Sequence, residues 1–171
     1  MSTESIREAQ EKLGRAIGEN PEKARGKNAA ATAVLTQDLQ FRVTGPNGEA
    51  VETDMPRGMG GGAAAPAPGW LLRAALASCT GTVIAMRAAK QGVALRTLEV
   101  TVESESDNRG LLGLDERISA GLSGLRLRVK IGADGTSADQ LRSLVQWGDR
   151  HSPVGCTLHE APAVRLDVEI V

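Results

Sequence analysis

The stretch PGWLLRAALASCTGTVIAMRAAKQGV, residues 68–93, decides the fold. Most of its side chains are apolar or small, and Pro68 and Gly92 suit the first turn and the end of a helix. Apolar or small residues recur at helical spacing along one face, namely Leu72, Ala75, Leu76, Cys79, Val83 and Met86. Lys90 continues the same spacing at the end of the helix. The pattern predicts one helix of about 24 residues, roughly 36 Å long. Because it is apolar nearly all round, we expect it to be buried on several sides.

Strand patterns flank this helix on both sides. Before it, residues 34–44 and 49–54 predict a hairpin, because Gly45-Pro46-Asn47-Gly48 between them is a strong turn signal. After it, apolar and charged residues alternate in segments 98–102, 125–131 and 164–170. Such alternation is typical of antiparallel sheets with one face exposed to water. The polar side is basic in segment 125–131 and largely acidic in the other two, so the basic strand is expected between acidic ones.

A second helix is predicted between the last two strands. Ser137 is its expected N-cap and Ser152-Pro153 its end, and residues 154–160 predict a short further turn. The inner stripe of this helix consists of Leu141, Leu144, Val145 and Gly148. The coarse order is ββ-α-ββ-α-β, which indicates an α+β fold.

The first 30 residues differ from the rest in composition. Ile6, Leu13 and Ile17 give only a sparse apolar stripe, and Asn20-Pro21 interrupts it. We therefore expect residues 1–30 to form a helical or flexible appendage to a domain of residues 31–171.

Composition excludes several functions. The chain has 171 residues, 41% hydrophobic and 24% charged, enough for one domain with a core. A net charge of −1 leaves no basic excess for nucleic-acid phosphates, and 2% aromatic residues provide no stacking platform. We find no apolar run approaching the roughly 20 residues of a membrane span, and no apolar secretory leader. The sequence thus predicts a cytoplasmic protein that binds neither nucleic acid nor membrane.

Cys79 and Cys156 are the candidate reactive groups. In a reducing compartment, two cysteines favour a buried, reactive or metal-bound role over a structural disulfide. Cys79 on the apolar stripe is read either as a small buried hydrophobe or as a reactive thiol. The second reading needs a nearby cation to lower its pKa, since Cys79 lies about three turns into the helix.

Cys156 also lies close to two histidines in the sequence, His151 and His159. A zinc site there is a weaker hypothesis, because only Cys79 remains to complete the usual set of ligands. No metal or other cofactor is predicted.

The order of these motifs resembles the OsmC/Ohr family, the osmotically inducible and organic hydroperoxide resistance proteins. The resemblance covers about residues 33–171. It rests on the Gly60-Gly61-Gly62 loop, on Cys79 within the long helix, and on Ser152-Pro153-Val154 before the final strand. It implies an intertwined homodimer in which antiparallel sheets wrap two long central helices and the active sites lie at the interface.

The resemblance also implies a thiol peroxidase. A cysteine thiolate would attack a small organic hydroperoxide and become a sulfenic acid. A second cysteine would resolve this as a disulfide, which an external dithiol would reduce. The alternative function, from another class, is a non-catalytic dimer that binds a small apolar ligand at its interface.

The family's functional positions map unevenly onto this chain. Cys79 occupies the reacting position, and Arg42 is the first candidate for the activating arginine, with Arg57 second. Gly69 stands where the family has its activating Glu, directly after a proline. At the resolving position stands Ser152, and Cys156 follows four residues later, which is about 6 Å along a helix axis. Cys156 is therefore the displaced candidate for the resolving thiol.

Overall fold

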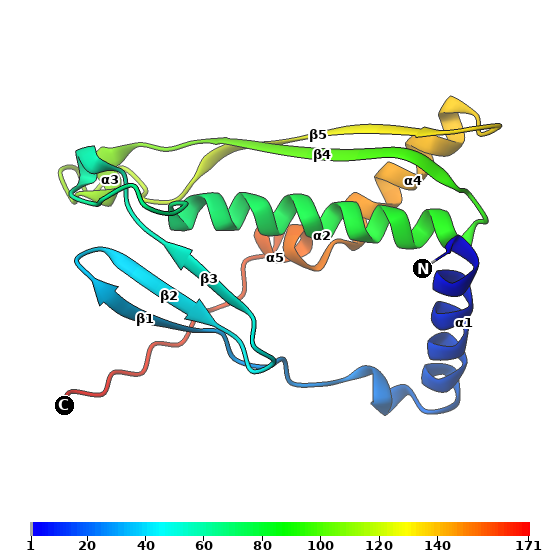
Figure 1. Cartoon of the computed structure of the whole chain (residues 1–171), viewed down its shortest axis with the longest axis horizontal. Coiled ribbons are helices and arrows are strands. Elements are labelled where there is room, and N and C mark those ends of the chain that lie inside the picture. The colour runs from blue at the N-terminus through cyan, green and yellow to red at the C-terminus, as the bar shows by residue number, and fades with distance from the viewer. Residues whose placement is uncertain (1) are drawn as a thin grey trace.

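The computed structural model describes residues 2–171 and contains two antiparallel sheets on opposite sides of one long helix (Figure 1). In chain order the elements are α1 (Thr3–Glu19), a 3₁₀ helix (Pro21–Ala24), β1 (Thr32–Gln37), β2 (Gln40–Thr44), β3 (Ala50–Thr53), a second 3₁₀ helix (Arg57–Met59), α2 (Pro68–Lys90), β4 (Leu95–Glu105), α3 (Asn108–Leu111), β5 (Ser123–Ala133), α4 (Ala138–His151) and α5 (Pro153–His159). The predicted α+β class is confirmed, with three strands instead of two before the central helix.

The first sheet is a meander in the order β1-β2-β3. The sequence pattern predicted one strand over residues 34–44, but a tight turn at Asp38 divides it into β1 and β2. Asp38 adopts a φ of 48°, a left-handed conformation that a short polar side chain tolerates. The alternation of apolar residues continues across this turn, so periodicity alone did not reveal it.

The second sheet pairs β4 with β5 over their whole length, as predicted. Glu99 lies opposite Lys130 and Glu103 opposite Arg126, while Glu103 also forms an ion pair with Arg128. The opposite face carries Leu98, Val100, Val129 and Ile131. This face packs on α2 and α4, which settles why charged and apolar residues alternate in these two strands.

Helix α2 has the predicted bounds, but a different stripe is buried. Its buried residues are Leu76, Thr80, Ile84, Ala88 and Ala89. Ile84 and Ala88 form the core with Val93 and Leu144, against partly buried side chains of β4, β5 and α4. By contrast Leu72 and Met86, from the stripe read off the sequence, remain 37% and 42% exposed. Of the predicted stripe Leu76 is buried, at 3% exposed, so the chain covers this apolar face only in part.

By length and apolar composition alone, α2 could cross a membrane, a criterion that the core helices of soluble proteins also meet. The sequence-based expectation that no segment approaches this criterion was wrong. Small residues of α2, such as Gly81 and Ala85, interrupt its run of large apolar side chains but add no charge, so the whole helix still meets the criterion.

Helices α4 and α5 follow the prediction closely. The Ser137 hydroxyl caps α4 by accepting the Gln140 N–H, and Ser152 caps α5 by accepting the Gly155 N–H. Gly148 lies where α4 crosses α2, and a Cβ there would come within 2.3 Å of Ile84 Cγ1. The glycine thus permits the close approach of the two helices.

The predicted last strand does not form. Residues 160–171 have no regular secondary structure and are exposed throughout. Val164, Leu166, Val168 and Ile170 are between 74% and 92% exposed. An extended segment gains stability only by pairing with another strand, and within residues 2–171 this segment has no such pair. In Figure 1 it runs away from α5 as a free tail.

The glycine-rich segment before α2 forms an ordered turn around Asp54. Asp54, 1% exposed, accepts hydrogen bonds from the N–H groups of Met55, Gly62 and Ala64. The bond from Ala64 lowers the pKa of Asp54 most, and burial opposes it. The carboxylate thus organises the entry to the central helix.

Candidate functional site

Cys79 lies near the middle of α2 as a free thiol, and it is half-buried. Leu72 and Met86, seven residues before and after it, share its side of the helix because seven residues make almost two full turns. None of these three side chains belongs to the core cluster, although Leu76 on the same side of the helix is buried. The structure therefore places Cys79 on an accessible apolar face instead of among fully buried side chains.

A buried polar pair lies directly beside Cys79. Thr80, the next residue, is 1% exposed and donates from Oγ1 to Ser152 Oγ at 3.2 Å. Ser152 is fully buried and also accepts the Gly155 N–H at the start of α5. This bond links α2 to the junction between α4 and α5. Ser152 stands at the position where the resemblance implies a resolving cysteine, whereas no motif in the sequence pointed to Thr80.

Cys156 lies one turn into α5, and its side chain is exposed. Its thiol Sγ donates to the carbonyl oxygen of Arg150 at 3.4 Å. Gly155, and not Cys156, occupies the buried side of this short helix. The thiol of Cys156 is thus directed at the surface beside the end of α4.

Arg42 is the candidate for the arginine that activates the thiol, and Gly69 stands at the position of the family's activating Glu. Arg42 on β2 forms an ion pair with Glu52 on β3, with 2.8 Å between Nη1 and Oε1. Within residues 2–171 no hydrogen bond or ion pair joins Arg42 to Cys79. Beside Gly69 lies Arg73, which donates to Ser104 on β4 at 3.2 Å. Arg73 is the only arginine in the first two turns of α2.

A shallow groove of about 610 Å³ runs between α2 and β4, and Cys79 is not among its lining residues. It is lined by Ala74, Ala77, Ser78, Gly81, Thr82, Ala85, Leu98 and Val100. Small side chains on the helix and apolar ones on β4 leave this space open. Ser78 at its edge directly precedes Cys79 in the chain.

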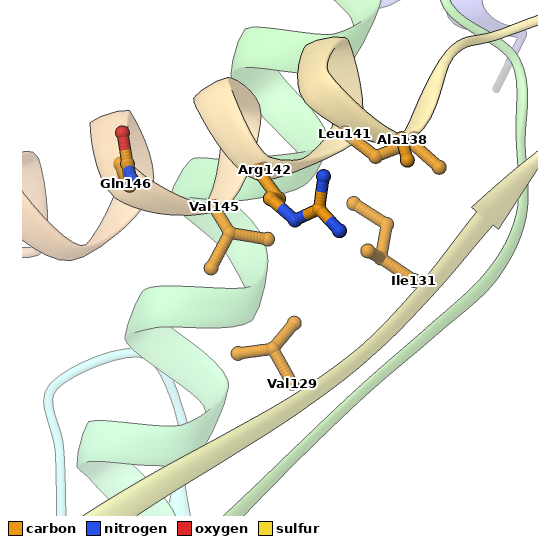
Figure 2. Close-up of a pocket in the computed structure, with 7 residues that line it drawn as sticks. All are labelled: Val129, Ile131, Ala138, Leu141, Arg142, Val145 and Gln146. Atoms are coloured by element: carbon orange, nitrogen blue, oxygen red, sulfur yellow. The ribbon is translucent and has the colours of Figure 1, made fainter.

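A second cavity, of about 350 Å³, lies between β5 and α4. Figure 2 shows Val129 and Ile131 of β5 facing Val145 of α4 across it, with Arg142 at the rim. Arg142 already forms an ion pair with Asp139 at 2.7 Å. This cavity contains neither cysteine, so it does not contribute to the thiol site.

Of the two histidines named for the zinc hypothesis, His151 is engaged elsewhere. His151 stacks on Trp147, with 4.0 Å between ring centroids, and its Nδ1 lies 2.7 Å from the Trp147 carbonyl oxygen. Arg87 covers the same Trp147 ring at 4.8 Å. In the described part of the chain, no three His, Cys, Asp or Glu side chains form a metal-binding group.

Comparison with protein families matches residues 60–167 to the model of OsmC-like proteins. The chain belongs to the OsmC-like family. The matched range contains Cys79, the Thr80–Ser152 pair and Cys156, so all of these lie within the family's domain. No curated protein matches the sequence.

Solved structures of the OsmC/Ohr type share the fold. An OsmC-like protein from Mycoplasma pneumoniae superposes with a TM-score of 0.67 at 19% identity, covering 80% of this chain and 91% of that one. An OsmC-like protein of unknown function from Vibrio cholerae gives 0.62 at 14% identity, covering 77% and 94%. An organic hydroperoxide resistance protein from Legionella pneumophila gives 0.54 at 20% identity, covering 78% and 90%. At these identities the likeness establishes the fold of this OsmC-like protein.

Proposed function

We propose that this OsmC-like protein reduces organic hydroperoxides with Cys79 as the reacting thiol. The observation that carries the proposal is the position of Cys79, half-buried on an accessible face of the central helix and next to the buried Thr80–Ser152 bond. Membership of the OsmC-like family, and structural neighbours named organic hydroperoxide resistance proteins, support it.

The proposed chemistry begins with the Cys79 thiolate. Its sulfur attacks the terminal oxygen of the hydroperoxide, the O–O bond breaks, and the alkoxide leaves as an alcohol after taking up a proton. The thiolate is oxidised to sulfenic acid while the peroxide is reduced. The apolar surroundings of Leu72 and Met86 suit an organic substituent on the peroxide. A thiol reductant then returns Cys79 to its starting state.

The thiolate also requires a cation, and within residues 2–171 Arg42 is paired with Glu52 and Arg73 with Ser104, not with Cys79. We propose that the working form is a homodimer in which a second copy supplies the cation, with Arg42 as the candidate. Arg42 is about half exposed and its partner Glu52 equally so, so the ion pair can rearrange at little cost. A guanidinium near the sulfur would lower the pKa of the Cys79 thiol.

The surface of the single chain supports the homodimer. Its accessible area is 12693 Å², whereas a compact monomer of 17.9 kDa exposes about 8,000 Å². The excess includes the apolar tail at residues 164–170 and the Cys79 face of α2. Obligate homodimers typically bury about 2,000–5,000 Å² of mostly apolar surface in total, or about 1,000–2,500 Å² per chain, so such an interface would cover a large part of this excess.

Replacement of the thiol tests the enzymatic proposal. We expect Cys79→Ser to abolish consumption of cumene hydroperoxide in an assay coupled to a dithiol, because no sulfur remains to accept the oxygen. Cys156→Ser is the matched control, since it removes the other thiol of the chain and should leave the first step intact. Trapping of a sulfenic acid on Cys79 with dimedone identifies that step directly. Equal turnover by Cys79→Ser and the wild type would refute the proposal.

The groove beside Ser78 favours a second candidate function. Its small side chains and apolar floor could hold a small apolar ligand at the interface of a non-catalytic dimer. The measured pKa of Cys79 in the dimer distinguishes the two functions. A value near or above the ordinary 8.5 or so, with no oxidation by mild peroxide, favours the binding protein.

A further inference from the structure

The fate of oxidised Cys79 depends on whether another thiol can reach it. The chain contains two cysteines, so within one chain Cys156 is the sole possible partner. A disulfide requires Cα atoms within about 7 Å and suitably directed side chains. Two observations bear on the reach of Cys156, and a third bears on the access of other thiols to Cys79.

First, the residue of this region that faces α2 beside Cys79 is Ser152. It is fully buried and bound to Thr80 at 3.2 Å. A hydroxyl is not oxidised by a sulfenic acid, so Ser152 cannot form the disulfide.

Second, the thiol of Cys156 points elsewhere. It is exposed and donates to the Arg150 carbonyl at 3.4 Å, whereas the neighbouring Gly155 is the buried residue of α5. To bring Cys156 to Cys79, α5 would have to rotate about its axis. Such a rotation would break the Ser152 cap and the buried Thr80–Ser152 bond together.

Third, Cys79 itself remains partly accessible on a face that the chain covers only in part. In the single chain a small molecule can therefore reach its sulfur without local unfolding, and the proposed homodimer must keep that route open, because the hydroperoxide enters by it.

We infer that the sulfenic acid of Cys79 is resolved by a small external monothiol and not by Cys156. This inference rests on the proposed function and specifies its reductant. The monothiol sulfur attacks the Cys79 sulfur and hydroxide leaves, taking up the thiol proton to form water, which gives a mixed disulfide. A second monothiol attacks the outer sulfur, releasing the external disulfide and reduced Cys79. Each cycle thus oxidises two monothiols and reduces one hydroperoxide.

The experiment treats the full chain with cumene hydroperoxide in the presence of glutathione as the probe monothiol, and analyses the products by non-reducing peptide mass spectrometry. We expect a glutathione adduct on Cys79 and no disulfide between Cys79 and Cys156. Steady-state turnover with glutathione should be the same for the wild type and Cys156→Ser, because Cys156 takes no part.

A Cys79–Cys156 disulfide, within or between chains, together with loss of turnover in Cys156→Ser would overturn this inference and leave the proposed function standing. Absence of any oxidation on Cys79, measured by dimedone trapping without glutathione, would overturn both. The two failures are therefore distinguishable.

Discussion

At the scale of single residues, a few polar side chains decide the local geometry around the site. Asp54 gathers three backbone N–H groups and so shapes the turn that leads into α2. Thr80 and Ser152 join α2 to α5 through one buried bond. The Asp54 turn depends on the direction of backbone N–H groups, and the Thr80–Ser152 bond joins residues far apart in the sequence, so residue spacing predicted neither of them. For the Asp54 turn, the sequence did contain one signal, an Asp followed by a glycine-rich run.

The Asp54 turn has a definite pH dependence. Hydrogen bonding lowers the folded pKa of Asp54 below its unfolded value of about 3.9. The stabilisation is therefore complete above that unfolded pKa and is lost as the pH falls through the folded pKa. We expect Asp54→Asn to lower the Tm at neutral pH, and the Tm difference from wild type to shrink in acid.

Asp38→Asn is the matched control, because Asn also tolerates the left-handed conformation of that exposed turn. Thermal unfolding followed by circular dichroism at both pH values measures the effect. A Tm difference for Asp54→Asn that is the same at neutral and acidic pH would contradict this account.

At the scale of elements, the crossing of α2 and α4 positions everything near Cys79. Helix α4 carries its cap and its stripe where the sequence predicted them. The depth of its contact is set by Gly148, which allows Ile84 to approach the α4 backbone. Residue spacing in the sequence identified Gly148 as part of the inner stripe of α4. Only the tertiary structure shows that the residue packed against it is Ile84.

A methyl group at this crossing should be costly. Gly148→Ala would place Cβ 2.3 Å from Ile84 Cγ1 and 3.2 Å from the Ile84 backbone nitrogen, so the helices must move apart. We expect a loss of about 1–3 kcal/mol in the free energy of unfolding, as for other overpacked cores. Urea unfolding measures it. Gly14→Ala on α1, where a Cβ meets nothing within 4 Å, should instead be neutral or stabilising by about 0.5–1 kcal/mol.

At the scale of the whole molecule, the single chain leaves too much apolar surface exposed for a compact protein. The tail at residues 164–170 has the alternation of a half-buried strand, with Leu166 and Val168 on its apolar side. We expect this side to be covered in the proposed homodimer. Its acidic residues would then suit the basic side chains of β5, the arrangement that the charge pattern predicts.

Substitutions on the two sides of the tail test whether its apolar side lies in the dimer interface. Leu166→Glu with Val168→Glu should shift the protein from dimer to monomer in sedimentation-velocity experiments, since buried carboxylates would oppose the interface. Asp167→Asn changes the other side of the same segment and removes at most one cross-strand charge pair, worth about 0.2–1 kcal/mol, so it should leave the dimer intact. A wild-type protein that sediments as a monomer would refute the homodimer.

The amino-acid sequence by itself determined the α+β class, the bounds of the central helix, the pairing of β4 with β5, the capped helix α4 and the position of Cys79. These features follow from local spacing, caps and alternation, which act over a few residues. Only the tertiary structure decided which face of α2 is buried, that Thr80 binds Ser152, where the thiol of Cys156 points and that the last segment stays unpaired. These depend on which surfaces meet, and a helix that is apolar nearly all round does not encode that choice in its own pattern.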